Sequence, residues 1–269
     1  MSNILELITT GFKSWWKNLA IILPFLFNGT ASSIVMIIGF LLALPILKIS
    51  FLDLFKITDE ATAEQFSQQL LSTLSNSSTL ALLIILSVII ILVVFLINAY
   101  FTSGAIGMSN DYFKFKKIVS LKEMHENGKK FLGRHFSYQL ITNIIFLAFL
   151  GIFFILMVIL KYNVFSIVLF ILAFIIVLVA GFFVSLTPYI FIIENSNLWP
   201  AFKKSFITVG NNFWPLLGLM VLWLLISSVI SIIYLIPVIG QIIGPIANSF
   251  IITPASEFSY VLFCRERKN

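Results

Sequence analysis

Residues 80–97 read LALLIILSVIIILVVFLI, a stretch without a single charged side chain. A helix needs about 20 mainly apolar residues to cross the hydrocarbon core of a bilayer, because it rises about 1.5 Å per residue. The quoted stretch lies within one of six apolar runs long enough to do so, which are residues 19–48, 78–108, 136–160, 166–193, 213–236 and 241–263. The whole chain of 269 residues is 60% apolar and only 10% charged, with a mean hydropathy of +1.08.

The length of the six runs decides the fold class. Strands of a membrane barrel need only about ten residues each, and the periodicity within the runs is helical or absent. We therefore predict an all-α polytopic membrane helix bundle with six transmembrane helices. We expect residues 1–269 to form a single integral membrane domain.

The few charged residues are sorted by side of the predicted membrane. With the N-terminus inside, the inner segments hold 14 of the 17 basic residues, and they are residues 1–18, 109–135, 194–212 and 264–269. An excess of Lys and Arg marks cytoplasmic loops. We expect a protein of the cell (inner or plasma) membrane with both termini in the cytoplasm. The net charge of +6 then predicts contact with anionic lipid headgroups on the cytoplasmic side rather than with nucleic acid.

An amphipathic stretch precedes the first, third and fifth runs. The apolar stripe of the first is formed by Ile4, Leu5, Ile8, Phe12, Trp15 and Trp16, opposite Lys13 and Lys17. Such a stripe with a cationic polar face is typical of a helix that lies in the headgroup plane. The sequence thus predicts three interfacial helices on the cytoplasmic side. Each is expected to end at a junction before its run, at residues 17–19, 134–136 and 211–213.

The surface helices and the runs suggest a repeated unit. A surface helix, a span, an outer turn and a returning span would occur three times, at residues 1–108, 119–194 and 198–264. The alternative is that any membrane hairpin with a basic inner loop has this pattern.

Polar side chains inside the predicted spans are the candidates for function. An ionised group at the bilayer centre costs about 3 kcal/mol on insertion scales, so such groups usually mark function. Glu257 and Glu194 are the candidate carboxylates, and Asn28 and Asn248 are the candidate amides. One reading is that both carboxylates pair near the inner face with basic residues of the surface helices, or, for Glu257, with a polar group there. The other is a protonatable carboxylate that faces a cavity.

The motifs of known intramembrane chemistry are missing from the sequence. There is no HExxH, no paired intramembrane Asp, no G-x-S-x-G and no phosphate-binding glycine loop. His125 and His135 lie ten residues apart without a cysteine cluster, which does not match a metal site. The single Cys264 excludes a disulfide within the chain. We expect no catalytic residue, no metal and no cofactor.

Four loose motifs in the C-terminal third carry a resemblance. They are TPYIFIIEN at 187–195, AFKKSF at 201–206, NNFW at 211–214 and LIPVIG at 235–240. In these stretches the chain resembles a poorly characterised family of prokaryotic six-helix membrane proteins, similar to the membrane domain fused to some glycerophosphodiester phosphodiesterases. The catalytic barrel of the fused proteins has no counterpart here. The resemblance therefore implies a fold and not an activity.

These observations together favour a non-enzymatic multi-pass membrane protein. We expect a membrane-organising, partner-binding or lipid-associated role, with the lipid bilayer as the main partner and a protein as a further one. The alternative is a small transporter or channel for an apolar or lipid-like solute, with Glu257 near its path. A third reading, an intramembrane enzyme, has no motif to support it. The sequence does not determine an oligomeric state.

Overall fold

The described part of the protein is helical. The structure, a computed structural model, describes residues 3–51, 60–161, 163–231 and 248–267. Its elements are α1 (Ile4–Lys17), the 3-10 turn η1 (Leu19–Ile21), α2 (Ile22–Ile46), α3 (Glu60–Leu74), α4 (Ser77–Phe115), α5 (Leu121–Ile159), α6 (Val164–Val184), α7 (Thr187–Glu194), α8 (Leu198–Asn211), α9 (Phe213–Ser231), the π-helical turn η4 (Asn248–Ile252) and α11 (Thr253–Glu266). No strand occurs in these ranges, so the predicted all-α class is confirmed.

Four helical segments are long and apolar enough to cross a membrane. They are residues 19–46, 77–115, 121–159 and 164–194, and a fifth is obtained if α8 and α9 are counted as one bent span. Helices of this length and apolar composition are consistent with a membrane protein. The predicted sixth span, residues 241–263, falls partly on residues 241–247, which lie outside the described ranges. Its described remainder is η4 and α11.

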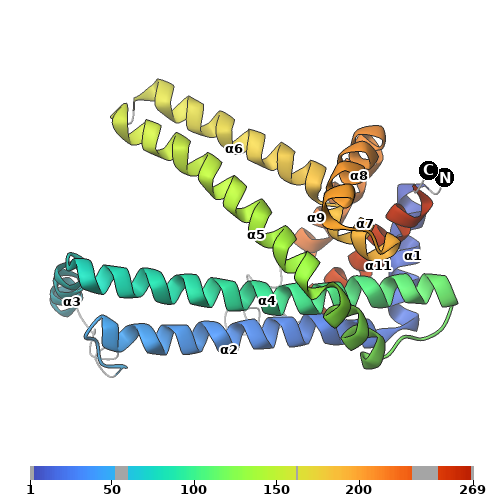
Figure 1. Cartoon of the computed structure of the whole chain (residues 1–269), viewed down its shortest axis with the longest axis horizontal. Coiled ribbons are helices and arrows are strands. Elements are labelled where there is room, and N and C mark those ends of the chain that lie inside the picture. Colours follow the sequence, from blue (N-terminus) through green and yellow to red (C-terminus); the bar gives the residue numbers. More distant parts are fainter. Residues whose placement is uncertain (1–2, 52–59, 162, 232–247, 268–269) are drawn as a thin grey trace. The chain divides into compact units, whose positions relative to one another are not determined.

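One of two compact units comprises residues 28–98. Within it, the parts of α2 and α4 run side by side (Figure 1). Gly39 permits this approach, because a Cβ atom at this position would lie 2.2 Å from the side chain of Ile90. Asn28 donates a hydrogen bond from Nδ2 to Oδ1 of Asn98 at 3.3 Å. The pair thus joins the two helices through a polar contact as well as through apolar packing.

The second unit comprises residues 1–27 and 99–269, and its core is built around α1 and α11. Gly11 of α1 lies directly on α11, where an added Cβ atom would be 2.5 Å from the carbonyl oxygen of Ala255. Ser259 of α11 donates a hydrogen bond to the carbonyl of Leu7 at 3.0 Å. The two helices therefore pack backbone to backbone, although they stand near opposite ends of the sequence.

The buried face of α1 includes most of the predicted apolar stripe. Ile8 is buried, and Ile4, Phe12 and Trp15 pack against the core, whereas Leu5 and Trp16 are 63% and 71% exposed. Leu7, Gly11 and Ser14 are also buried, although they do not belong to the predicted stripe. The small residues lie at the contact with α11 because that helix approaches so closely.

The helices α5 to α8 form the other side of this unit. α5 and α6 pack as a hairpin, and Asn163 caps the start of α6 by accepting a hydrogen bond from the backbone N–H of Ser166 at 2.8 Å. α7 follows α6 after a short break and has Pro188 in its first turn. α8 then packs against α6 and α7, and it meets α9 at an angle of 91°.

Two of the three predicted junctions are helix breaks. The chain leaves helical geometry at Asn18, with φ −142° and ψ 65°, and at Asn212, with φ −128° and ψ 33°. The junction predicted at residues 134–136 is wrong, because α5 runs through it without interruption. At about 1.5 Å per residue, this helix of 39 residues is about 58 Å long, so it extends well beyond the hydrocarbon core.

Candidate functional site

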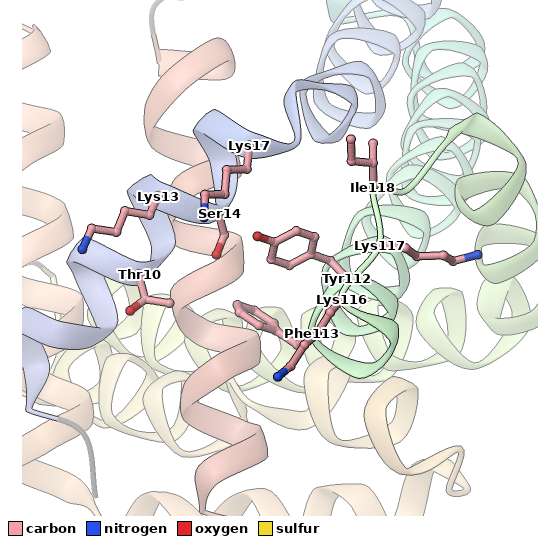
Figure 2. Close-up of a pocket in the computed structure, with 9 residues that line it drawn as sticks. All are labelled: Thr10, Lys13, Ser14, Lys17, Tyr112, Phe113, Lys116, Lys117 and Ile118. Atoms are coloured by element: carbon pink, nitrogen blue, oxygen red, sulfur yellow. The ribbon is translucent and has the colours of Figure 1, made fainter.

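A strongly cationic hollow in the second unit is a cavity between α1 and the end of α4. Its volume is about 670 Å³. It is lined by Thr10, Lys13, Ser14, Lys17, Tyr112, Phe113, Lys116, Lys117 and Ile118, and we call it the lysine cavity. In Figure 2, α1 supplies one wall, and the opposite wall comes from the last turn of α4 and the segment that follows it.

The turn after α4 brings two lysines to this cavity. α4 ends at Phe115, and Lys116 then adopts a left-handed conformation with φ 52°, while its N–H bonds to the carbonyl of Tyr112 at 2.8 Å. A positive φ is uncommon for a residue with a side chain, and here it reverses the chain in a single step. The chain thereby turns away from α4, and both Lys116 and Lys117 belong to the residues that line the cavity.

A capping box fixes the far end of this turn. The Ser120 side chain accepts a hydrogen bond from the backbone N–H of Lys122 at 3.3 Å, and the Glu123 carboxylate accepts from the backbone N–H of Ser120 at 3.0 Å. The hydroxyl of Ser120 also donates to Glu123. Such a box satisfies N–H groups that the first turn of a helix leaves free. The turn is therefore fixed on one side by the end of α4 and on the other by the capped start of α5.

Positive charge dominates the lysine cavity. The described part of its lining holds four lysines and no carboxylate. Lys117 points away from the cavity in Figure 2 and pairs with Glu123 at 2.9 Å, and this hydrogen bond raises the pKa of Lys117. Within the described ranges, Lys13, Lys17 and Lys116 have no ion-pair partner. Three cations thus remain available to an anion from outside.

The other polar groups of the lining are hydroxyls. Thr10, Ser14 and Tyr112 supply them, and Figure 2 shows the Tyr112 hydroxyl directed toward Ser14. Hydroxyls donate hydrogen bonds to phosphate or carboxylate oxygens, and ammonium groups supply the balancing charge. Among the described lining residues, none is a histidine, cysteine or carboxylate. The arrangement therefore suits binding of an anion.

Glu257, the foremost sequence candidate, lies apart from this cavity in α11. It is buried, at 5% exposure, and its Oε2 accepts a hydrogen bond from the hydroxyl of Tyr189 at 3.2 Å. Its Oε1 is also buried and has no hydrogen-bond partner among the described residues. The expected partner was a basic residue or a polar group, and the structure provides a polar group, the hydroxyl of a tyrosine in α7.

Glu194, the second candidate carboxylate, ends α7 and pairs with a lysine of the next helix. Nζ of Lys204 lies 2.8 Å from Oε1 of Glu194. The prediction of a basic partner is confirmed for this residue. Asn195 follows in a left-handed conformation with φ 51°, which turns the chain toward α8. Glu194 thus helps to hold α7 and α8 together.

The two candidate amides take separate places. Asn28 belongs to the unit of residues 28–98, where Nδ2 bonds to Asn98 and Oδ1 is buried without a partner in the described chain. Asn248 opens η4, and its carbonyl accepts a hydrogen bond from the Thr253 hydroxyl at 3.2 Å. The structure therefore does not gather the four sequence candidates into one site.

The two histidines do not belong to a cluster of metal-ligating side chains in the described part of the chain. The Ser103 hydroxyl and Nδ1 of His135 are 2.9 Å apart in the core, and His125 contacts Tyr100. Across the described ranges, no group of three or more His, Cys, Asp or Glu side chains has an arrangement that could hold a metal ion.

The lysine cavity itself was not predicted as a site. The sequence showed the cationic face of residues 1–18 and the basic segment 109–135, but not that they face each other. Tyr112 and the left-handed Lys116 carried no signal in the sequence. A lysine pair immediately after a long apolar helix is the feature that would have directed attention there.

Comparison with known proteins places the chain in a family. Residues 30–263 match the model described as "Domain of unknown function (DUF7847)". No curated protein and no solved structure matches the chain. The match covers most of the sequence. It includes three of the four long apolar segments completely and the first one from residue 30 onward.

Proposed function

The chain belongs to the DUF7847 family. From its charge pattern and its lysine cavity we propose that it is a non-enzymatic multi-pass membrane protein with a lipid-associated role. Its working site is the lysine cavity, which binds the anionic headgroup of a membrane lipid. The observation that carries this proposal is the combination of three lysines without an ion-pair partner, three hydroxyls and no carboxylate among the described residues that line about 670 Å³.

The charge distribution supports the proposed location of this site. Most of the basic residues lie in the segments assigned to the cytoplasmic side, and the cavity is built from two of these segments, residues 1–18 and 109–135. Anionic lipids enriched in a cytoplasmic leaflet attract each nearby Lys by about 1 kcal/mol. We propose a cell-membrane protein with both termini in the cytoplasm and the cavity at the inner headgroup level.

The test compares lipid retention between charge-matched variants of the full chain. The first replaces the three unpaired cavity lysines, Lys13, Lys17 and Lys116, with Gln. The control replaces Lys122, Lys129 and Lys130 of α5, which lie outside the cavity lining, and so has the same net charge. Native mass spectrometry of protein taken from phosphatidylglycerol nanodiscs counts the lipids that remain bound.

We expect the cavity variant to lose one phosphatidylglycerol molecule and the control to keep it. A phosphatidylglycerol carrying a photoreactive group on its headgroup should label Tyr112 or Ile118 in the unmodified protein. Equal lipid loss in both variants would show that diffuse positive charge, and not the cavity, holds the lipid. Labelling far from α1 and the end of α4 would refute the site.

A transporter for an apolar or lipid-like solute is the second candidate. It is favoured by the buried Oε1 of Glu257, which has no hydrogen-bond partner among the described residues. A carboxylate in this position is suited to take up and release a proton. Replacement of Glu257 by Gln should then stop pH-dependent solute flux in proteoliposomes while the protein stays folded. If flux is absent in the unmodified protein, this candidate is excluded.

A further inference from the structure

A second, apolar groove runs between α5, α6 and α8. Its volume is about 600 Å³, within the range of about 300–1,000 Å³ that is typical of ligand sites. It is lined by Ile141, Thr142, Ile145, Phe146, Ala180, Val184, Trp199, Phe202, Lys203, Phe206 and Ile207. It shares no lining residue with the lysine cavity.

The groove exists because α8 is fastened across the α5–α6 hairpin. The Ser205 hydroxyl donates a hydrogen bond to the carbonyl of Phe183 at 2.7 Å, and the rings of Phe183 and Phe206 stack with centroids 5.5 Å apart. Phe202 packs against Tyr138 of α5, with ring centroids 5.6 Å apart. These contacts make α8 a third wall, and the small Ala180 of α6 leaves space between the walls.

The open side of the groove is part of the surface that faces lipid. Ile141 and Ile145 are 43% and 57% exposed, and both belong to α5, one of the segments long and apolar enough to cross a membrane. A hollow in such a surface is filled from its surroundings, and the surroundings of a membrane-spanning helix are acyl chains. The apolar lining thus identifies the chemistry of one end of the occupant.

Lys203 identifies the chemistry of the other end. It is the only charged residue among the described residues of the lining. Its neighbour Lys204 pairs with Glu194, whereas Lys203 has no carboxylate partner in the described part of the chain. Trp199, 79% exposed, stands one helical turn before Lys203. Exposed Trp and Lys side chains are characteristic of the membrane–water interface.

We propose that this groove holds one acyl chain of an anionic phospholipid, with the lipid phosphate paired to Lys203. The acyl chain lies against Ile145 and Phe146, and the headgroup lies beside Trp199. The site is separate from the lysine cavity, and the inference does not depend on the function proposed for that cavity. The protein would therefore carry two lipids at defined positions, one held mainly by its headgroup and one held mainly by its chain.

The first test uses the unmodified protein in nanodiscs that contain phosphatidylglycerol with a diazirine in its acyl chain. After irradiation, peptide mass spectrometry locates the labelled residues. We expect labels on groove residues, above all on Ile145, Phe146 or Phe206. Labels spread evenly over the exposed faces of α5 and α6 would show ordinary bulk lipid and would overturn the proposal.

The second test compares variants by the number of lipids that native mass spectrometry detects after mild delipidation. Ala180→Leu fills the groove, and Lys203→Gln removes its charge. The controls are Val179→Leu, which enlarges an adjacent residue outside the lining, and Lys129→Gln. We expect Lys203→Gln to retain phosphatidylglycerol about fivefold less well than Lys129→Gln, as the loss of one Lys contact predicts. We expect Ala180→Leu to retain it less well than Val179→Leu, because the larger side chain occupies the groove.

A third test compares how well the protein retains different classes of lipid. Phosphatidylcholine with the same acyl chains should be retained less well than phosphatidylglycerol by the unmodified protein, and this difference should vanish in Lys203→Gln. Equal retention of the two lipids by the unmodified protein would refute the role of Lys203. Displacement of the phospholipid by oleate at equal concentration would identify a fatty-acid site and overturn the assignment to a phospholipid. The lysine-cavity variants serve as a further control, because they should leave the chain label unchanged.

Discussion

Replacement of Gly11 by Ala should separate α1 from α11. The added Cβ atom would lie 2.2 Å from Oγ of Ser259 and 2.5 Å from the carbonyl oxygen of Ala255. The serine can rotate, but the backbone carbonyl cannot, so one helix has to move. The change tests whether this backbone contact holds the core of the larger unit together.

The magnitude follows from three opposing effects. Overfilling a packed interface costs about 1–3 kcal/mol. Rotation of Ser259 also removes its hydrogen bond to the carbonyl of Leu7, which contributes about 1 kcal/mol. Against these, Ala in place of Gly in a helix interior gains about 0.8–1.0 kcal/mol. We expect a net loss of about 1–3 kcal/mol in the free energy of opening the α1–α11 contact.

The single cysteine provides the assay. Cys264 lies in α11 and is 6% exposed, so a maleimide reacts with it only when the helix opens. The expected loss corresponds to a modification rate about 5–150 times higher in detergent at constant temperature. The control is Gly133→Ala in α5, where an added Cβ atom has nothing within 4 Å. This control should react no faster than the unmodified protein, and a similar acceleration in both variants, or none in Gly11→Ala, would refute the reasoning.

Three further predictions concern the turn before α5, the buried carboxylate and the orientation. Ser120→Ala should weaken the first turn of α5 by about 1 kcal/mol, seen as faster amide hydrogen exchange there. Glu123 lies in this turn, ahead of the apolar part of α5, and its hydrogen bond from the Ser120 side chain lowers its pKa to about 2. Its ionised form thus stabilises the turn above pH about 4.5, and the protection of these amides relative to their intrinsic exchange rate should fall as the pH falls from there toward 2, a change that is absent from Glu123→Gln. Glu257→Gln should lower the thermal stability in detergent if the carboxylate is structural; an unchanged melting temperature would count against that role. In a Cys264→Ser background, an impermeant thiol reagent applied to intact cells should label cysteines placed in residues 49–77 and spare one at His125, and the reverse pattern would invert the proposed topology.

Proline positions explain which junctions of the fold could be predicted. Pro215 follows Asn211 by four residues, and it lacks the N–H that a continuous helix would bond to the carbonyl of Asn211. Pro24 stands in the same relation to Ala20, and a 3-10 turn precedes α2 there. No proline follows residues 134–136 within that distance, so α5 continues. The polar pattern alone suggested three equal breaks, but only backbone chemistry separates true breaks from continuous helix.

The long apolar helices were predictable because lipid-facing residues need no specific partner. Residues 80–97 form a helix wherever a bilayer surrounds them, and the structure places them within α4. Contacts between distant segments carried no such signal. The partner of Glu257 is Tyr189, and the partner of Gly11 is α11, and both depend on how helices far apart in sequence pack. The lysine cavity belongs to the same class, since its walls come from α1 and from the turn after α4.

The pairing of α1 with α11 has a consequence for biosynthesis. The hydrogen bond between Ser259 and Leu7 joins residues 252 positions apart. At about 5–20 residues per second, a ribosome releases α11 roughly 10–50 s after α1. During that interval the face of α1 that packs on α11 lacks its native partner, and an amphipathic segment without a partner binds the nearest membrane surface or a chaperone. α1 is therefore made well before the contact that fixes its position can form, and mutations at its contact with α11 should reduce the yield of inserted protein before they affect the finished fold.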